Sequence, residues 1–232
     1  MIKVISFKIC PFVQRVTAAL ESRNIPYEIE YISLSDKPKW FLDISPNGQV
    51  PVLITESGTA LFESDAIIEY IDDHYKPLQE LSSEEKALER AWSYLASKYY
   101  LVQCSTMRSS DKRTLEERSQ NLAKAFEKAE KYLGQGPLFK AGNISKVDIA
   151  WLPLLHRAAI IEKHTCHDFL ADFPKVKKWQ AALLETGIAQ KSVAQDFESA
   201  FTDFYLSEKT YLGKGEDCAG GADNACATNS CC

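Results

Sequence analysis

Long hydrophobic runs and an excess of basic residues are both missing from this sequence. No apolar run approaches the roughly 20 residues that a membrane span requires, so we expect no membrane association. Lys and Arg number 27 against 32 Asp and Glu, and the resulting net charge of −5 disfavours nucleic acid as the main partner. The chain runs from Met1-Ile2-Lys3 directly into an extended apolar segment, so we expect no signal peptide and a cytoplasmic location.

A disulfide framework and a metal-binding motif are also missing. The seven cysteines form an odd set, and four of them stand in the last fifteen residues. His156, His164, Cys166 and His167 lie near one another in the sequence but lack the paired spacing of structural zinc sites. We therefore expect no structural disulfide scaffold and no metal.

The composition that remains is that of a globular protein. The chain has 232 residues, of which 45% are hydrophobic and 25% charged, so it is long enough for two modest domains. Over residues 1–77 the pattern predicts the order β-α-β-α-β-β-α, with strands at 2–7, 27–32, 50–54 and 60–62. This order predicts a small mixed sheet flanked by helices.

From residue 83 onward the apolar period is helical almost throughout. The spacing predicts helices at 84–107, 111–133, 147–162, 174–185 and 193–205, so residues 83–212 are expected to form an all-helical domain. Ser145 and Asp148 have the spacing of a capping box for the most apolar of these helices. Residues 213–232 are rich in Gly, Ala, Asn and Asp, and we expect them to form a disordered tail.

Cys10 stands where the first predicted strand ends and the first helix begins. Pro11 suits the first helical position, and Val13 and Val16 continue at helical spacing. The unpaired N–H groups and the positive end of the helix dipole favour a thiolate at such a position. The sequence therefore predicts a reactive, ionised cysteine, and the alternative is a buried inert one.

Two other places have the residue types of a ligand site. If the Val50-Pro51 bond is cis, the backbone N–H and C=O of Val50 are free to pair with an extended peptide. Glu63 and Ser64 precede a helix whose N-terminus can bind a carboxylate, with Glu63 available to an ammonium group. The alternatives are an ordinary edge strand and ordinary helix caps.

At these places the chain resembles a known family, the glutathione transferases. The resemblance is to the cysteine-type omega class and to the plant-type dehydroascorbate reductases. It implies a thioredoxin-like domain that binds glutathione as co-substrate, followed by an all-α domain for the second substrate. The segments that carry it are Cys10-Pro11-Phe12-Val13-Gln14-Arg15, Ser35-Asp36-Lys37-Pro38-Lys39-Trp40-Phe41-Leu42, Pro46-Asn47-Gly48-Gln49-Val50-Pro51-Val52-Leu53 and Phe62-Glu63-Ser64-Asp65-Ala66-Ile67-Ile68-Glu69-Tyr70.

The resemblance implies roles for residues near the first helix. Cys10 would be the catalytic nucleophile, and Phe12 would form a wall of the site. Lys37 would contact the glycine carboxylate of glutathione, although an exposed lysine is usually only solvated.

It also implies roles for residues around the later strands. Val50 would pair through its backbone ahead of a cis Pro51. Glu63 and Ser64 would hold the γ-glutamyl end of glutathione.

The resemblance and the motif together favour reduction over conjugation. Position 13 is valine, so a Cys-x-x-Cys pair is absent and the enzyme is expected to work as a monothiol. Phe7 has no hydroxyl with which to activate glutathione, and Ser6 is a less favoured substitute for Cys10. Conjugation or dehalogenation of electrophiles is the enzymatic alternative. A non-catalytic binding or regulatory protein on the same fold is the other.

The second substrate is expected to bind between the domains. Trp92, Tyr99 and Arg157 are the candidates for this pocket, with core packing or an interdomain ion pair as the alternatives. Family members commonly form homodimers, so the resemblance also implies a homodimer.

Overall fold

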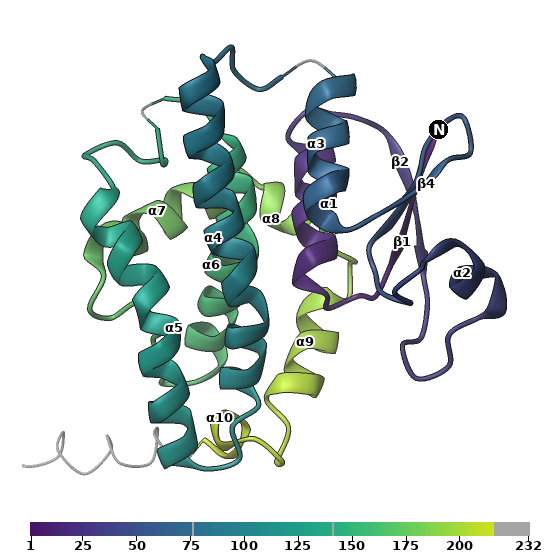
Figure 1. Ribbon diagram of the computed structural model, residues 1–232. Coiled ribbons are helices and arrows are strands. Elements are labelled where there is room, and N and C mark those ends of the chain that lie inside the picture. Colours follow the sequence, from purple (N-terminus) through teal and green to yellow (C-terminus); the bar gives the residue numbers. More distant parts are fainter. Residues whose placement is uncertain (76, 141, 216–232) are drawn as a thin grey trace, which may run out of the picture.

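The computed structural model describes residues 1–75, 77–140 and 142–215. A four-stranded sheet with flanking helices lies beside a larger group of helices, and the two parts are joined after α3 (Figure 1). The strands follow the predicted positions closely: β1 Ile2–Ser6, β2 Tyr27–Tyr31, β3 Val52–Ile54 and β4 Ala60–Phe62.

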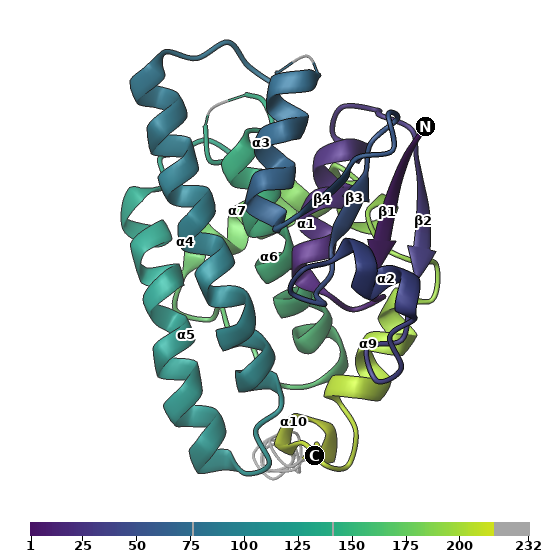
Figure 2. The ribbon, with the colours of Figure 1, turned by 45° about the vertical axis from the view of Figure 1, so that its right-hand side comes forward.

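The sheet is mixed, with the strand order β2-β1-β3-β4 (Figure 2). β1 and β2 are parallel and are joined through a helix, as parallel neighbours require. β3 is antiparallel to β1 and forms a hairpin with β4. The order β-α-β followed by a β-hairpin and a helix is that of the thioredoxin-like fold, so the predicted fold of this part is confirmed.

Helices cover both faces of the sheet. α1 (Pro11–Glu21) and α3 (Ser64–His74) lie between the sheet and the helical part, whereas α2 (Lys39–Ile44) lies on the opposite face (Figure 1). Phe41 of α2 joins Ile5 and Val52 in a small apolar cluster on that outer face. Residues 39–44, where the predicted order places the second helix, therefore form a helix anchored by one buried ring.

The helical part is built around α6, as its uninterrupted apolar character predicts. Nearly all of α6 is buried, and the predicted capping box of Ser145 and Asp148 is present at its start. Ser82 and Glu85 form a second capping box at the start of α4. The helices are α4 Ser83–Met107, α5 Lys112–Tyr132, α6 Lys146–His164, α7 Pro174–Glu185, α8 Ile188–Lys191, α9 Phe197–Tyr205 and α10 Tyr211–Lys214.

The two parts share one hydrophobic core. Buried side chains of β1, α1 and α3 belong to the same apolar cluster as those of the helical part, and α1 packs directly on α6. Because this joint is buried, the position of the first turn of α1 is fixed by both parts of the chain.

Two expectations need adjustment at the C-terminal end. The predicted helix at 193–205 begins only at Phe197, as α9, and a short helix that the sequence did not predict, α8, precedes it, with Ser192 to Asp196 between them. Gly213 and Lys214 belong to α10, and the remainder of the predicted tail, residues 216–232, lies outside the described residues. The exact domain limits 1–77 and 83–212 stay a prediction. None of the described helices is long and apolar enough to cross a membrane.

Candidate active site

Cys10 is the N-cap residue of α1, and Pro11 is the first residue of that helix, as the sequence predicts. The backbone N–H groups of Val13 and Phe12 point toward the Cys10 sulfur and act to lower its pKa, although the sulfur makes no capping hydrogen bond to the helix. The N–H of Cys10 itself donates to the carbonyl of Phe7 at 3.0 Å, which closes the turn between β1 and α1. The sulfur is therefore fixed at the open N-terminus of a helix.

The charge state of this sulfur differs from the expectation. Burial raises the pKa of the Cys10 thiol to about 11, and the N–H groups of Val13 and Phe12 and the charge of Arg157 lower it only in part. The prediction of a thiolate at neutral pH is therefore wrong for this structure. The helix N-terminus acts in the expected direction, but the desolvation of the sulfur is the larger effect.

One side of Cys10 opens into a cleft of about 300 Å³. Its walls come from the first turn of α1, the segment before α2, the turn before β3 and the start of α3, with Leu101 of α4 at its edge. All seven residues that the sequence analysis assigned to glutathione chemistry line this cleft: Cys10, Phe12, Lys37, Val50, Pro51, Glu63 and Ser64.

The Val50-Pro51 bond is cis, which the sequence alone left open. Neither the N–H nor the C=O of Val50 is hydrogen-bonded to another described residue, and β3 begins only at Val52. Both backbone groups are therefore free for a ligand in extended conformation.

Glu63 and Ser64 lie at the start of α3. Glu63 has a φ of 65°, a left-handed conformation that is uncommon for a residue with a side chain. Its side chain does not cap the helix, so the capping alternative is wrong for this residue. The exposed carboxylate instead accepts a hydrogen bond from Asn47 Nδ2 at 2.8 Å. The chain thus holds a carboxylate over the cleft.

A second cleft, of about 600 Å³, opens on the other side of Cys10. It lies between the β1–α1 turn, the C-terminal end of α4, and α9, and Arg118 of α5 also lines it. The sequence analysis assigned no role to the residues of the helical part that line it, namely Leu101, Cys104, Ser105, Arg108, Arg118, Phe204 and Tyr205. Helical spacing could have shown that they share helix faces, but not that these faces meet at Cys10.

A buried polar network supports the first turn of α1 from behind. The guanidinium of Arg157 donates to the carbonyl of Ile9 at 3.2 Å, to that of Pro153 at 3.0 Å and to Gln14 Oε1. Gln14 Nε2 is 2.8 Å from His156 Nδ1, and burial lowers the pKa of His156 to about 3. His156 is therefore neutral at physiological pH, and this network joins α1 to α6.

The three residues predicted for the second-substrate pocket lie elsewhere. Trp92 packs among the rings of Tyr132, Phe139 and Trp151, so the core-packing alternative holds for it. The ammonium of Lys128 lies over the ring of Tyr99, and its Nζ is 6.0 Å from the centroid of that ring.

Arg157 is fully buried behind the site and lines neither cleft. The prediction of a pocket walled by Trp92, Tyr99 and Arg157 is corrected accordingly. The structure offers the second cleft in its place.

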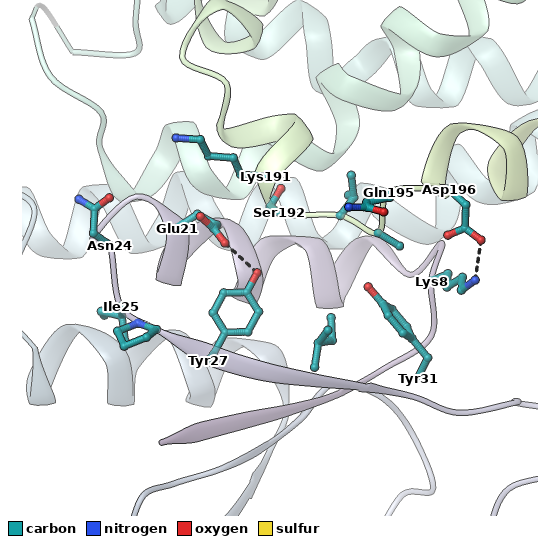
Figure 3. Close-up of a pocket in the computed structure, with 14 residues that line it drawn as sticks. Lys8, Glu21, Asn24, Ile25, Tyr27, Tyr31, Lys191, Ser192, Gln195 and Asp196 are labelled. Carbon is teal, nitrogen blue, oxygen red and sulfur yellow. Dashed lines mark hydrogen bonds and ion pairs between the residues drawn. The ribbon is translucent and has the colours of Figure 1, made fainter.

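A larger cavity, of about 830 Å³, lies away from this sulfur, between β2, α1 and the segment that joins α8 to α9 (Figure 3). Its prominent polar groups are paired with one another: the Tyr27 hydroxyl with Glu21 at 3.0 Å, and Lys8 with Asp196 at 2.6 Å. No thiol is among its lining residues, so size alone does not identify the reactive site.

The histidines considered as metal ligands have other partners. His156 belongs to the buried network, and His164 is 2.6 Å from Glu198. Across residues 1–75, 77–140 and 142–215, no three His, Cys, Asp or Glu side chains are grouped so that they could hold a metal ion.

A thioredoxin-like domain followed by an all-helical domain is the arrangement of the glutathione-transferase class of folds, and here Cys10 lines the cleft between the two parts. Family models agree with this assignment. Residues 9–74 match the glutathione S-transferase N-terminal domain, and residues 113–182 match the glutathione S-transferase C-terminal domain. The chain belongs to the glutathione S-transferase family.

Relatives of known name are consistent with this membership. Glutathione S-transferase omega-1 of Rattus norvegicus is 32% identical, over 81% of this chain and 78% of its own. Glutathione S-transferase DHAR2 of Arabidopsis thaliana is 32% identical, over 67% of this chain and 70% of its own. The structure of rice GST1 in complex with glutathione has a TM-score of 0.75 at 20% identity, covering 88% of this chain and 98% of that one, and so has the same fold.

Proposed function

We propose that this chain is a glutathione-dependent thioltransferase and dehydroascorbate reductase with Cys10 as its nucleophile. The observation that carries the proposal is the position of Cys10, which lines both a narrow cleft with groups complementary to glutathione and a wider second cleft. Relatives named omega-1 and DHAR2 and a neighbour of the same fold with bound glutathione support it.

Glutathione has four groups that the narrow cleft can hold. The free N–H and C=O of Val50 suit the peptide backbone of its cysteine, as in the addition of a strand to a sheet. The exposed carboxylate of Glu63 suits the γ-glutamyl ammonium, and Ser64 with the N-terminus of α3 suits the γ-glutamyl carboxylate. Lys37 is the cation for the glycine carboxylate. Phe12 forms the wall of the cleft next to the sulfur of glutathione.

The chemistry is two successive thiol-disulfide exchanges. Cys10 loses its proton and attacks the glutathione sulfur of a mixed disulfide, and a Cys10-glutathione bond forms. The substrate sulfur leaves as a thiolate and takes up a proton. A second glutathione attacks this bond, releases Cys10 and leaves as glutathione disulfide. The mixed disulfide thus consumes one reduced glutathione, because the other half of the glutathione disulfide comes from the substrate. Dehydroascorbate consumes two, which supply the two electrons and two protons that convert it to ascorbate and leave as one glutathione disulfide.

The wider cleft favours anionic substrates. Arg108 and Arg118 line it, and the guanidinium of Arg108 lies 5.4 Å from the ring centroid of Phe204. Two cations beside an aromatic ring suit an anionic group on the half of the mixed disulfide that is not glutathione, since the glutathione half occupies the narrow cleft. The apolar lining also suits an aryl electrophile, which makes glutathione conjugation the second candidate function. Rates with a glutathione mixed disulfide, dehydroascorbate and an aryl halide distinguish the two candidates.

The direct test of the nucleophile is Cys10→Ser. We expect both reductase activities to fall by about four orders of magnitude, the scale on which covalent nucleophiles act. Ser6→Ala is the control, because Ser6 is the nearby hydroxyl that could substitute for Cys10, and it should retain most activity. Unchanged reduction by Cys10→Ser would show that another group is the nucleophile.

The assembly and location are part of the same proposal. We propose a homodimer, since α4 presents exposed apolar side chains such as Leu88 and Tyr94, and sedimentation velocity would test it. A cytoplasmic location suits a reaction that consumes reduced glutathione. Limited proteolysis between residues 77 and 83 would test the proposed domain limits.

A further inference from the structure

A second cysteine, Cys104 of the helical part, lines the same cleft as Cys10. Cys104, on α4, is half-buried, and it and Cys10 are the free cysteines among the described residues, whereas Cys166 is disulfide-bonded. Both free cysteines line the 600 Å³ cleft. They are 94 positions apart in the sequence, so no Cys-x-x-Cys motif announces the pair.

Ring packing brings the elements of these cysteines together. Phe12, two residues after Cys10, packs edge-to-face on Tyr100, with ring centroids 5.0 Å apart. Tyr100 precedes Cys104 by four residues, which is one helical turn along the same face of α4. This contact holds the N-terminus of α1 against the part of α4 that carries Cys104.

One buried cation acts on both sulfurs. Burial lowers the pKa of Arg157, and the nearby Cys104 and Cys10 sulfurs act in the opposite direction, Cys104 more strongly than Cys10. Nε of Arg157 is buried and has no hydrogen-bond partner among the described residues. The attraction is mutual: the charge of Arg157 lowers the pKa of Cys10 in turn, and the same guanidinium lies close to Cys104.

Tyr205 of α9 adds a proton donor beside Cys104. Burial raises the pKa of Tyr205, and electrostatic and hydrogen-bond interactions with Cys104 raise it further. The phenol is therefore protonated at neutral pH, and its O–H is a hydrogen-bond donor beside the Cys104 sulfur. Cys104 thus has the Arg157 guanidinium and the Tyr205 phenol as neighbours at the cleft.

We propose that Cys104 is a resolving thiol, which attacks the Cys10-glutathione mixed disulfide from across the shared cleft. The inference rests on the proposed function, since that function supplies the mixed disulfide. It also extends that function, because an internal thiol takes the place of the second glutathione at this step.

The exchange is balanced without any further oxidant. Cys104 loses its proton, its sulfur forms a bond to the Cys10 sulfur, and the bond between Cys10 and glutathione breaks. Glutathione leaves as a thiolate and takes up a proton. Two glutathione molecules then reduce the Cys10-Cys104 disulfide to two thiols and leave as one glutathione disulfide. A thiol held in the same cleft reacts at a high effective concentration, which favours this route over a second encounter.

The test is to treat the full-length reduced protein with one equivalent of glutathione disulfide. After alkylation of free thiols, peptide mass spectrometry identifies the partner of Cys10. In the wild type we expect a Cys10-Cys104 linked peptide as the main product. In Cys104→Ser we expect the Cys10-glutathione adduct to accumulate about tenfold above its wild-type level, because the exchange that removes it is blocked.

Ser97→Ala is the matched control, because it removes a hydroxyl from the same helix outside both clefts and should leave the linked peptide unchanged. Equal adduct levels in the wild type and Cys104→Ser, with no linked peptide, would overturn the resolving role and leave the proposed function intact. Absence of any glutathione on Cys10 in both proteins would overturn the proposed function and this inference with it. The wild-type product is read without any variant, so a folding defect in Cys104→Ser does not decide the outcome.

Discussion

The two sides of Cys10 are built in different ways. The narrow cleft is formed almost wholly by residues 10–64, in short segments at the ends of strands and helices. The wider cleft takes most of its walls from α4, α5 and α9, which meet only when the helical part packs on the sheet. The difference teaches that one half of the site is local in sequence, whereas the other half depends on the assembly of the fold.

The largest expected effect concerns the sulfur that both sides share. Since burial raises the pKa of Cys10 to about 11, its thiolate fraction should rise with pH until about pH 11. The rate of alkylation of Cys10 by iodoacetamide should therefore increase about tenfold per pH unit from pH 7 to 10, roughly a thousandfold in all. Peptide mass spectrometry resolves Cys10 from the other cysteines, and circular dichroism checks the fold. A plateau below pH 8 would mean that the helix N-terminus and Arg157 outweigh burial.

The next effect tests how far the helical part supports the first turn of α1. Arg157→Ala leaves Gln14 Oε1 and the carbonyl of Ile9 without their buried donor and also creates a cavity. We expect the free energy of unfolding to fall by about 3–5 kcal/mol, measured by urea denaturation.

Arg90→Ala is the control for this prediction. It truncates an arginine whose pair with Glu69 is partly exposed, and it should cost less than about 1 kcal/mol. Equal decreases in the free energy of unfolding in both variants would contradict a special role of Arg157 where α1 packs on α6.

Much of the architecture could be predicted from residues that are close together in the sequence. Pro11 after Cys10 predicted the start of α1, and Ser145 with Asp148 predicted the start of α6. Such signals depend only on residues within one helical turn, so a sequence can report them. The seven residues of the narrow cleft were found in this way, because each stands in a motif at the end of an element.

The wider cleft was not found because it has no local signal. Trp92 and Tyr99 were correctly assigned to α4, the helix that lines the wider cleft. The apolar spacing of a helix, however, does not show which other element packs against each of its faces. Trp92 joins an aromatic cluster, while Leu101 and Cys104, further along the same helix, face Cys10. Arg157 was expected to face a substrate and instead donates to backbone carbonyls, a role fixed only by tertiary packing.

A smaller effect is expected on glutathione binding in the narrow cleft alone. Glu63→Gln removes the charge proposed to bind the ammonium of glutathione, and a charge-assisted hydrogen bond of this kind contributes roughly 1.5–3 kcal/mol. We expect the KM for glutathione to rise about tenfold or more, with the KM for the second substrate unchanged. Glu28→Gln, on the exposed face of β2, is the matched control. A rise in both KM values would contradict the division between the two sides.

The smallest effect is expected on binding of the second substrate in the wider cleft. Phe204→Ala shortens an exposed ring at this cleft and removes part of its apolar wall. We expect the KM for a glutathione mixed disulfide to rise about threefold, since little apolar area is lost, with the KM for glutathione unchanged. Tyr31→Ala, an exposed ring on β2 outside both clefts, should change neither constant. An unaltered KM in Phe204→Ala would indicate that the second substrate binds elsewhere.

The single core that spans the sheet and the helical part limits how this protein can be divided or recombined. α1 buries Val13 and Val16, and α6 packs on the same helix, so a fragment ending after α3 would expose apolar surface to water. Chimaeras with relatives should therefore exchange α1 and α6 as a matched pair.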